Sequence, residues 1–319
     1  ALAGFTAAVV VAGMGGVALS AALTAGRNVP AGGLPTQTPA ATERPTPQAP
    51  SPSPTPTAPV SPASVGCATT VDMSVWAHYD DDLLFLNPTL SDAIRNGHCV
   101  RTVFLTASDA GRGGVYASAR ELGILRAYNT MRGEEGLWTE NKVTLLTGLA
   151  VSQWSPEGDP DITVTFVRLP DGNLNGGGFP STGYVSLPQL LDGSLAELAP
   201  VGGGPGTTLD TLVRSIAELI DAYHPERLFT AVPRESAEWS AEDHPDHAST
   251  GSITRLAWQR AGFAPDQVSY AIGYPTLSLS ANVIGEPLTR KVETFRVYAA
   301  QDPVVACPTD DACLTIPKF

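Results

Sequence analysis

Charged side chains are scarce in this sequence, and basic ones are the scarcest. Only 16% of the 319 residues are Asp, Glu, Lys or Arg, and 32 acidic residues outnumber 19 basic ones, for a formal net charge of −13. Nucleic-acid binding depends on a basic surface that neutralises phosphates. The composition therefore excludes nucleic acid as an expected partner.

Several common signatures of catalysis and binding are also missing. The sequence has no HExxH, the signature of many zinc peptidases. Its glycine-rich runs SDAGRGG and DGNLNGGG match neither the GxGxxG nor the Walker pattern. No CxxC spacing is present to support a zinc site built from cysteines. We therefore expect neither that kind of peptidase nor a phosphate-cradling loop.

Charge is wholly absent from the first 26 residues, and the first charged side chain is Arg27. About 20 apolar residues are enough to span a bilayer. We therefore expect residues 1–26 to be an apolar helix, acting as a transmembrane anchor or a long signal sequence. The alternative interpretation is a helix buried in a protein core, but the segment is followed by a linker rather than by a folded domain.

Proline, by contrast, is concentrated in residues 27–66. Eleven of the 28 prolines lie between Pro30 and Pro62, interleaved with Ser and Thr. Such a segment cannot bury a core and is typically extended. We predict a disordered linker that holds a folded domain, 67–319, away from a membrane. The expected location is extracytoplasmic, either anchored in the cell membrane or secreted if the first segment is cleaved.

The four cysteines all lie in the expected folded domain, and an even number in an exported protein suggests two disulfides. Cys67 and Cys99 each fall shortly before a predicted strand. If these strands are parallel neighbours, both cysteines lie at the same edge of the sheet. Cys307 and Cys313 are close in sequence. We therefore predict the pairs Cys67–Cys99 and Cys307–Cys313.

Strand-like and helix-like segments alternate from residue 67 onward. The expected strands are 71–77, 101–107, 162–169, 227–232 and 268–274, and the expected helices include 116–133, 209–223 and 245–261. This alternation predicts an α/β fold with a mostly parallel sheet and helices on both faces. Ligands of such folds bind outside the carboxyl ends of the strands. Three unusual loops, AHYDDD, SDAGRGG and PRESAEWSAEDHPDH, should converge there.

Histidine is rare, and three of the five histidines lie in two of these loops. His78 and Asp81 are three residues apart, as are His244 and His247. At a helix start this spacing places both side chains on one face. Two histidines and one carboxylate are the donors of many catalytic zinc sites. A helix N-cap cluster, or a polar turn that opens a helix at Pro245, is the alternative for either motif alone.

The two motifs together resemble the PIG-L/LmbE-like family of zinc-dependent N-acetylglucosaminyl deacetylases. That family usually has AHPDDE and HPDH where this sequence has AHYDDD and HPDH. The resemblance covers most of 71–301. Supporting matches are LTASDAG (105–111), Arg120-Glu121, LPDGN (169–173) and the segment with Lys291, Tyr298 and Gln301. The resemblance implies a Rossmann-like fold, and together with residues 1–66 it predicts an exported, membrane-tethered member of bacterial type.

Residue by residue, the resemblance implies one zinc ion per chain, with other divalent metals possible, held by His78, Asp81 and His247. It makes Asp80 the general base. His244 would stabilise the oxyanion or protonate the leaving amine, and Asp246 would orient it.

The resemblance also implies substrate contacts from Arg120 and Asp171. Trp239 is a separate candidate for lining a sugar groove, because it lies in the loop before DHPDH and aromatic faces suit sugar rings. The implied substrate is an N-acetylated amino sugar, from which the enzyme would remove the acetyl group.

Two residues depart from the family pattern. Tyr79 replaces the usual proline and Asp82 the usual glutamate. Tyr79 removes a rigid φ and adds a bulky group near the site. The shorter Asp82 is expected to lengthen or lose a hydrogen bond behind the metal ligands. These departures support the alternative function, an inactive extracellular glycan-binding module on the same fold.

Overall fold

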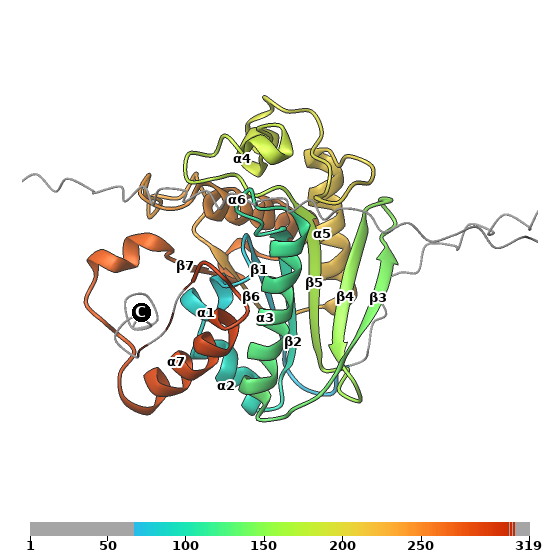
Figure 1. Ribbon diagram of the computed structural model, residues 1–319. Coiled ribbons are helices and arrows are strands. Elements are labelled where there is room, and N and C mark those ends of the chain that lie inside the picture. The colour runs from blue at the N-terminus through green and yellow to red at the C-terminus, as the bar shows by residue number, and fades with distance from the viewer. Residues whose placement is uncertain (1–66, 306, 308, 310–319) are drawn as a thin grey trace, which may run out of the picture. The chain divides into compact units, whose positions relative to one another are not determined.

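A seven-stranded sheet organises the chain in this computed structural model, which describes residues 67–305, 307 and 309. The strands are β1 (Val71–Trp76), β2 (Cys99–Thr106), β3 (Trp138–Thr144), β4 (Ala150–Pro156), β5 (Ile162–Leu169), β6 (Arg227–Ala231) and β7 (Val268–Ala271). Their order is β3-β4-β5-β2-β1-β6-β7 (Figure 1). Strands β5, β2, β1, β6 and β7 run parallel, whereas β4 is antiparallel to both neighbours. The predicted, mostly parallel sheet is confirmed.

Helices cover both faces of the sheet, which confirms the Rossmann-like α/β prediction (Figure 1). They are α1 (Asp81–Phe85), α2 (Thr89–Arg95), α3 (Gly114–Arg132), α4 (Leu187–Asp192), α5 (Leu209–Tyr223), α6 (Pro245–Arg260) and α7 (Gly285–Ala299), with short 3₁₀ turns η1 (Pro180–Thr182), η2 (Pro265–Gln267) and η3 (Tyr274–Ser278). One apolar core lies under α4, α5 and α6, and a second lies under α1, α2, α3 and α7.

The central strands are buried because each of them faces both cores. In β1, Met73 and Val75 pack in the first core and Trp76 in the second. In β2, Val103 and Phe104 likewise point to opposite sides. Side chains alternate along a strand, so a strand covered on both faces is a nearly continuous apolar run. Both strands are buried along their whole length, although Asp72 and Ser74 interrupt the apolar residues of β1, and Arg101 and Thr102 those of β2.

Helix α5 follows directly from its sequence pattern. Its buried residues include Leu212, Ile216 and Ile220, which recur at the spacing of one helix face. Thr208 caps its start, because the hydroxyl accepts a hydrogen bond from the Thr211 amide at 3.1 Å. The amphipathic face closes the first core.

Strands β3 and β4, which form a hairpin, and helices α4 and α7 were not predicted. Four consecutive residues of β3, Thr139–Lys142, are exposed at the edge of the sheet, so the segment lacks an alternating apolar pattern. Trp138 and Trp154 pack against the second core, as expected of most aromatic residues. Pairing with a neighbour, rather than a local pattern, defines this hairpin.

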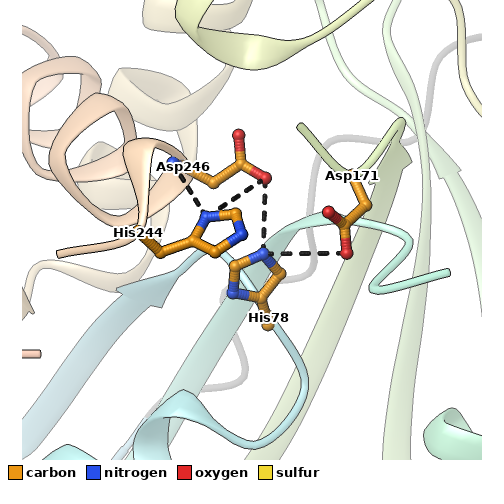
Figure 2. Close-up of side chains that lie close together, drawn as sticks. All are labelled: His78, Asp171, His244 and Asp246. Atoms are coloured by element: carbon orange, nitrogen blue, oxygen red, sulfur yellow. Dashed lines mark hydrogen bonds and ion pairs between the residues drawn. The ribbon is translucent and has the colours of Figure 1, made fainter. Parts of the chain in front are cut away.

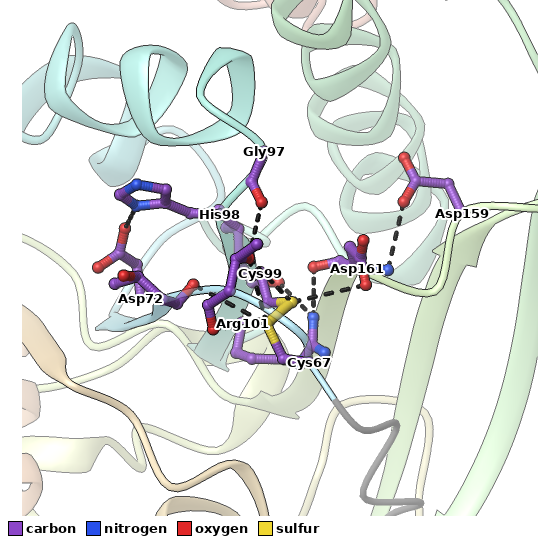
Figure 3. Close-up of a disulfide and its surroundings, with 11 residues drawn as sticks. Cys67, Asp72, Gly97, His98, Cys99, Arg101, Asp159 and Asp161 are labelled. Carbon is purple, nitrogen blue, oxygen red and sulfur yellow. Dashed lines mark hydrogen bonds and ion pairs between the residues drawn. A yellow bond between two sulfur atoms is a disulfide. The ribbon is translucent and has the colours of Figure 1, made fainter.

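The predicted Cys67–Cys99 disulfide is present, with its Cα atoms 6.0 Å apart (Figure 3). It forms because β1 and β2 are parallel neighbours, with Val71 opposite Cys99. At the same edge, His98 Nδ1 lies 2.8 Å from Asp72 Oδ2, away from the loops predicted to bind metal. Cys307 is also disulfide-bonded. Its predicted partner, Cys313, lies outside the described residues, so that pair stays a prediction.

The expected anchor (1–26) and linker (27–66) lie outside the described residues. Within the part of the chain that the structure describes, none of the helices combines the length and apolar character needed to cross a bilayer. The predicted membrane-anchored location is therefore wrong on this finding. The apolar character of residues 1–26, on which that prediction depended, is a property of the sequence alone.

Helix α7 fixes α1, the helix that starts at the predicted metal ligands. Lys291 of α7 donates a hydrogen bond from Nζ to the carbonyl oxygen of Leu84 at 2.7 Å. The side chain is only 2% exposed, and its burial lowers the pKa of Lys291 to about 7. A cation at the end of α1 is favourable for the helix dipole, but its burial is costly.

We expect Lys291→Met to remove part of the pH dependence of stability. Because the pKa of Lys291 is lowered from 10.5 to about 7 on folding, the unfolded state binds more protons between these pH values. The free energy of unfolding therefore rises with pH in this window, by at most about 1.4 kcal/mol per pH unit. Urea denaturation of both proteins at about pH 7.5 and 9.5 measures the difference. Equal pH dependence in the two proteins would contradict this assignment.

Candidate metal centre

The loops at the carboxyl ends of four parallel strands meet at one edge of the sheet. His78 and Asp81 follow β1, Asp171 follows β5, and the loop after β6 leads to His244 and His247 at the start of α6. The loop after β2 also joins them, since the Ala110 amide donates to Asp171 Oδ2 at 3.3 Å. The convergence expected from the strand order is confirmed.

Three donor atoms from the predicted ligands face one another. His247 Nε2 lies 3.1 Å from Asp81 Oδ1 and 3.2 Å from His78 Nδ1, and the latter two atoms are 3.5 Å apart. All three residues are buried. The structure thus brings together two imidazole nitrogens and one carboxylate oxygen at a single point, with geometry that could hold a cation.

The backbone holds Asp81 in this position. Its Oδ2 accepts hydrogen bonds from the amides of Ala77 and His78, at 3.1 and 2.8 Å, which leaves Oδ1 facing the histidines. Burial alone would raise the pKa of Asp81, but His247 and His78 outweigh it and hold the pKa well below its ordinary value. Asp81 is therefore a carboxylate, the form that a metal requires.

The carboxylate of Asp246 lies closer to His78 than to His244 (Figure 2). Its Oδ2 lies 3.3 Å from His78 Nε2 and 3.9 Å from His244 Nδ1. Asp171 Oδ2 is 3.9 Å from the same His78 nitrogen. The sequence predicted that Asp246 orients His244; in the structure its carboxylate faces mainly His78, and its backbone amide bonds His244. A bond from Nε2–H to Asp246 leaves the Nδ1 lone pair of His78 free to face Asp81.

The loop after β5 leaves no room for a side chain beside Asp246. The Gly172 amide donates to Asp246 Oδ2 at 2.7 Å. A Cβ atom at Gly172 would lie 2.3 Å from Asp246 Oδ1. Glycine at this position of the LPDGN run thus permits the close approach of the two loops.

His244 is the N-cap residue of α6, and its ring orientation is set by the backbone. Its Nδ1 accepts a hydrogen bond from the Asp246 amide at 3.2 Å. The proton of the neutral ring therefore lies on Nε2. Burial, assisted by the neighbouring His78, lowers the pKa of His244 to about 4. His244 is a neutral hydrogen-bond donor at pH 7.

Asp80 is held by Arg120. Arg120 Nη2 donates to Asp80 Oδ1 at 2.7 Å, and Nη1 donates to the Ser108 carbonyl oxygen at 2.7 Å. Its Nε lies 3.1 Å from Asp302 Oδ2 and also bonds the Tyr298 hydroxyl. Burial raises the pKa of Asp80, while Arg120 opposes this rise. Arg120 therefore already has four protein partners. The predicted contact between Arg120 and the substrate would be made in addition to these four.

A cavity of about 180 Å³ opens onto these groups. Its lining residues are His78, Asp80, Ala110, Arg120, Asp171, Asn173, Leu174, Phe179, His244 and Tyr274. Trp239 is 39% exposed in the loop before α6 and does not line this cavity, so its sugar contact stays a prediction. A larger cavity, of about 710 Å³, lies between β4 and the loop 200–208 and contains none of the predicted site residues.

Tyr79 and Asp82 turn away from this cavity, whereas Tyr79 was expected to add a bulky group near the site. Tyr79 is fully buried in the second core, and its hydroxyl donates to Glu121 Oε1 at 3.0 Å. Asp82 is also fully buried and accepts a hydrogen bond from the Tyr128 hydroxyl at 2.7 Å. Burial raises the pKa of Asp82 to about 8. Both departures from the family pattern therefore affect the core beneath the site rather than the surface of the cavity.

Two acidic residues next to the site escaped prediction, Asp243 and Asp302. Asp243 Oδ1 lies 2.8 Å from His247 Nδ1, and Asp302 contacts Arg120. Asp243 directly precedes the HPDH motif, and this position is the one feature of the sequence that could have indicated its place at the site. Asp302 belongs to the segment after α7, and nothing in its local sequence distinguishes it.

The sequence that forms this site matches a known protein family. A family model described as PIG-L, GlcNAc-PI de-N-acetylase, matches residues 73–258. No protein of curated function matches the chain.

Several solved structures resemble parts of the chain. The A40926 pseudoaglycone deacetylase is 15% identical, with 75% of this chain and 86% of that chain covered and a TM-score of 0.44. A zinc-inhibited teicoplanin deacetylase is 15% identical (76% and 89% covered, TM-score 0.42). The N,N'-diacetylchitobiose deacetylase from Pyrococcus horikoshii is 13% identical (74% and 72% covered, TM-score 0.39).

The family match spans more than half of the 319 residues and includes both histidine motifs. The chain therefore belongs to the PIG-L family and is a metal-dependent N-deacetylase.

Proposed function

We propose that residues 67–319 form a zinc-dependent hydrolase domain that removes the acetyl group from an N-acetylated amino sugar. The observation that carries the proposal is the convergence of His78 Nδ1, His247 Nε2 and Asp81 Oδ1 within 3.1–3.5 Å of one another. The family description, which refers to an N-acetylglucosamine-containing lipid, supports the class of substrate.

The donor set fits a catalytic zinc ion. Zinc in hydrolases commonly takes three protein ligands from His and Asp or Glu and leaves a fourth position open. Each proposed histidine ligand also bonds a carboxylate through its other nitrogen, as Asp246 does for His78 and Asp243 for His247. When bound, the metal supplies Lewis-acid activation of the amide carbonyl and of water. Other divalent metals that bind histidine and carboxylate ligands could occupy the same site.

Asp80 is proposed as the general base. It lines the cavity, its Oδ1 is fixed by Arg120, and it is not one of the three converging donors. Its raised pKa makes it a better proton acceptor than an exposed aspartate. Asp80 would take a proton from the attacking water and deliver it to the amine nitrogen as the amide bond breaks, which balances the hydrolysis.

His244 is proposed to stabilise the oxyanion. Because its Nδ1 is occupied by the Asp246 amide, its neutral ring offers Nε2–H as a donor toward the cavity that it lines. A neutral imidazole donates a hydrogen bond readily but has no second proton to give to a leaving amine. Of the two roles expected from the sequence, this geometry favours stabilisation of the oxyanion.

The cavity size limits what enters it. Pockets for drug-sized ligands typically occupy about 300–1,000 Å³, and this cavity of about 180 Å³ is smaller. We infer that the acetamido group and its sugar ring enter, while the rest of the substrate stays outside. Asp171, whose carboxylate lines the cavity, is proposed as an acceptor for sugar hydroxyls.

The alternative function, an inactive glycan-binding module, had Tyr79 and Asp82 as its only support. Both side chains point into the core. They leave the proposed ligands, base and oxyanion donor intact, so no observation on the described residues now favours that alternative.

Acetate release tests the proposal. We expect the full chain loaded with zinc to release acetate from N-acetylglucosamine glycosides, to lose this activity after chelation, and to regain it when zinc is restored. N-acetylated peptides serve as the control, because the cavity is proposed to admit a sugar ring. Acetate release that is insensitive to chelation, or peptide cleavage without sugar deacetylation, would reject the proposed reaction.

A further inference from the structure

Asp243 is the residue on which three hydrogen bonds beside the metal centre converge. Its Oδ1 accepts from His247 Nδ1 at 2.8 Å, from the His244 amide at 2.8 Å and from the Tyr274 amide at 3.0 Å. The side chain is 5% exposed. The family motif HPDH does not include this carboxylate, and the proposed hydrolysis does not use it.

The first of these bonds determines which nitrogen of His247 faces the metal ligands. A carboxylate can only accept, so the proton of a neutral His247 ring lies on Nδ1. The lone pair of Nε2 then points toward Asp81 Oδ1, 3.1 Å away, and His78 Nδ1, 3.2 Å away. A carboxylate behind a histidine ligand fixes its tautomer and raises its basicity.

The other bonds attach a second element to the same point. Tyr274 begins η3 after β7 and lines the cavity. A Cβ atom at Gly273 would lie 2.3 Å from Asp243 Oδ1 and 2.7 Å from His247 Nδ1. The backbone after β7 therefore packs directly on the Asp243–His247 pair, and only glycine allows this approach.

We propose that Asp243 is a positioning residue, which presents His247 Nε2 to the metal and fixes Tyr274 at the wall of the cavity. This inference rests on the proposed function, in that it takes His247 as a metal ligand. The competing interpretation is that Asp243 only caps the turn before α6. Capping would contribute to folding but not to metal affinity.

Metal affinity distinguishes these interpretations. The zinc dissociation constant of the full chain is measured by competition with a chromophoric chelator for wild type, Asp243→Ala and Asp243→Asn. Glu242→Gln is the matched control, because it removes the adjacent negative charge from an exposed side chain. We expect Asp243→Ala to bind zinc about 10- to 100-fold more weakly, Asp243→Asn to lie between it and wild type, and Glu242→Gln to match wild type.

Nitrogen-15 NMR of the imidazole rings provides a readout independent of activity. In zinc-loaded wild type we expect His247 to be protonated at Nδ1 and coordinated at Nε2. The metal-free Asp243→Ala variant should show a mixture of tautomers at His247. The Asp243→Asn variant keeps the shape of the side chain and serves if Asp243→Ala does not fold.

Three results would overturn the inference. Unchanged zinc affinity in both Asp243 variants would show that Asp243 only caps the turn. An equal loss in Glu242→Gln would assign the effect to net charge rather than to contact with His247. Absence of zinc binding in wild type would reject the proposed metal site itself, and with it this inference. The last result is recognised without any variant, so the two failures are distinguishable.

Discussion

Asp80→Asn is expected to lower kcat by about 10²- to 10⁴-fold, the range that general-base catalysis usually contributes, without loss of metal. Asparagine keeps the shape of the side chain and an oxygen that can accept the 2.7 Å bond from Arg120, but it cannot take a proton from water. Asp80 is not one of the three converging donors, so zinc content should be unchanged. Steady-state acetate release and elemental analysis of the same preparation measure both quantities.

The control for this variant is Asp266→Asn, which makes the same chemical change at an exposed position in η2. It should match wild type in both measurements. Near-normal turnover in Asp80→Asn would show that another group is the base. Loss of zinc from Asp80→Asn would instead place Asp80 among the ligands and require a new assignment of the whole loop.

Asp81→Ala is expected to abolish metal binding, with zinc falling from about one ion per chain to none. The substitution removes the carboxylate oxygen that faces both His78 Nδ1 and His247 Nε2. It also removes the acceptor for the amides of Ala77 and His78, so the loop after β1 should loosen. Elemental analysis after reconstitution with zinc measures the loss, and acetate release should fall with it.

Circular dichroism is the necessary control for Asp81→Ala, because a misfolded protein would also lack metal. A folded variant that still holds one zinc ion would exclude Asp81 as a ligand. A wild type that holds no zinc after reconstitution would reject the metal site, whatever the variant does. Together, the two adjacent aspartates should give opposite results for metal content and the same result for activity.

The sequence alone determined the architecture well, because its central strands and α5 carry strong local patterns. Strands β1 and β2 are rich in apolar and β-branched residues and each face two cores, and α5 repeats apolar residues on one face. Parallel pairing then followed from strand–helix alternation, and the Cys67–Cys99 disulfide followed from parallel pairing. The edge hairpin β3–β4 lacked such a pattern, because Thr139–Lys142 are exposed.

The sequence also determined which residues gather at the candidate site. His78, Asp81, His244 and His247 are chemically distinctive in a chain with only five histidines. The strand order sends their loops to the same edge of the sheet, so their proximity was predictable. Their distances and donor atoms were not, since these depend on the side-chain conformations of residues more than 150 positions apart.

Only the tertiary structure decided how each side chain at the site is directed. It turned Tyr79 and Asp82 into the core, directed the carboxylate of Asp246 toward His78, and placed Asp243 behind His247. The physical reason is that a side chain's direction is set by the partners that satisfy its polar atoms, and a buried polar atom without a partner is costly. Those partners come from other strands and helices, so no local pattern in the sequence records them.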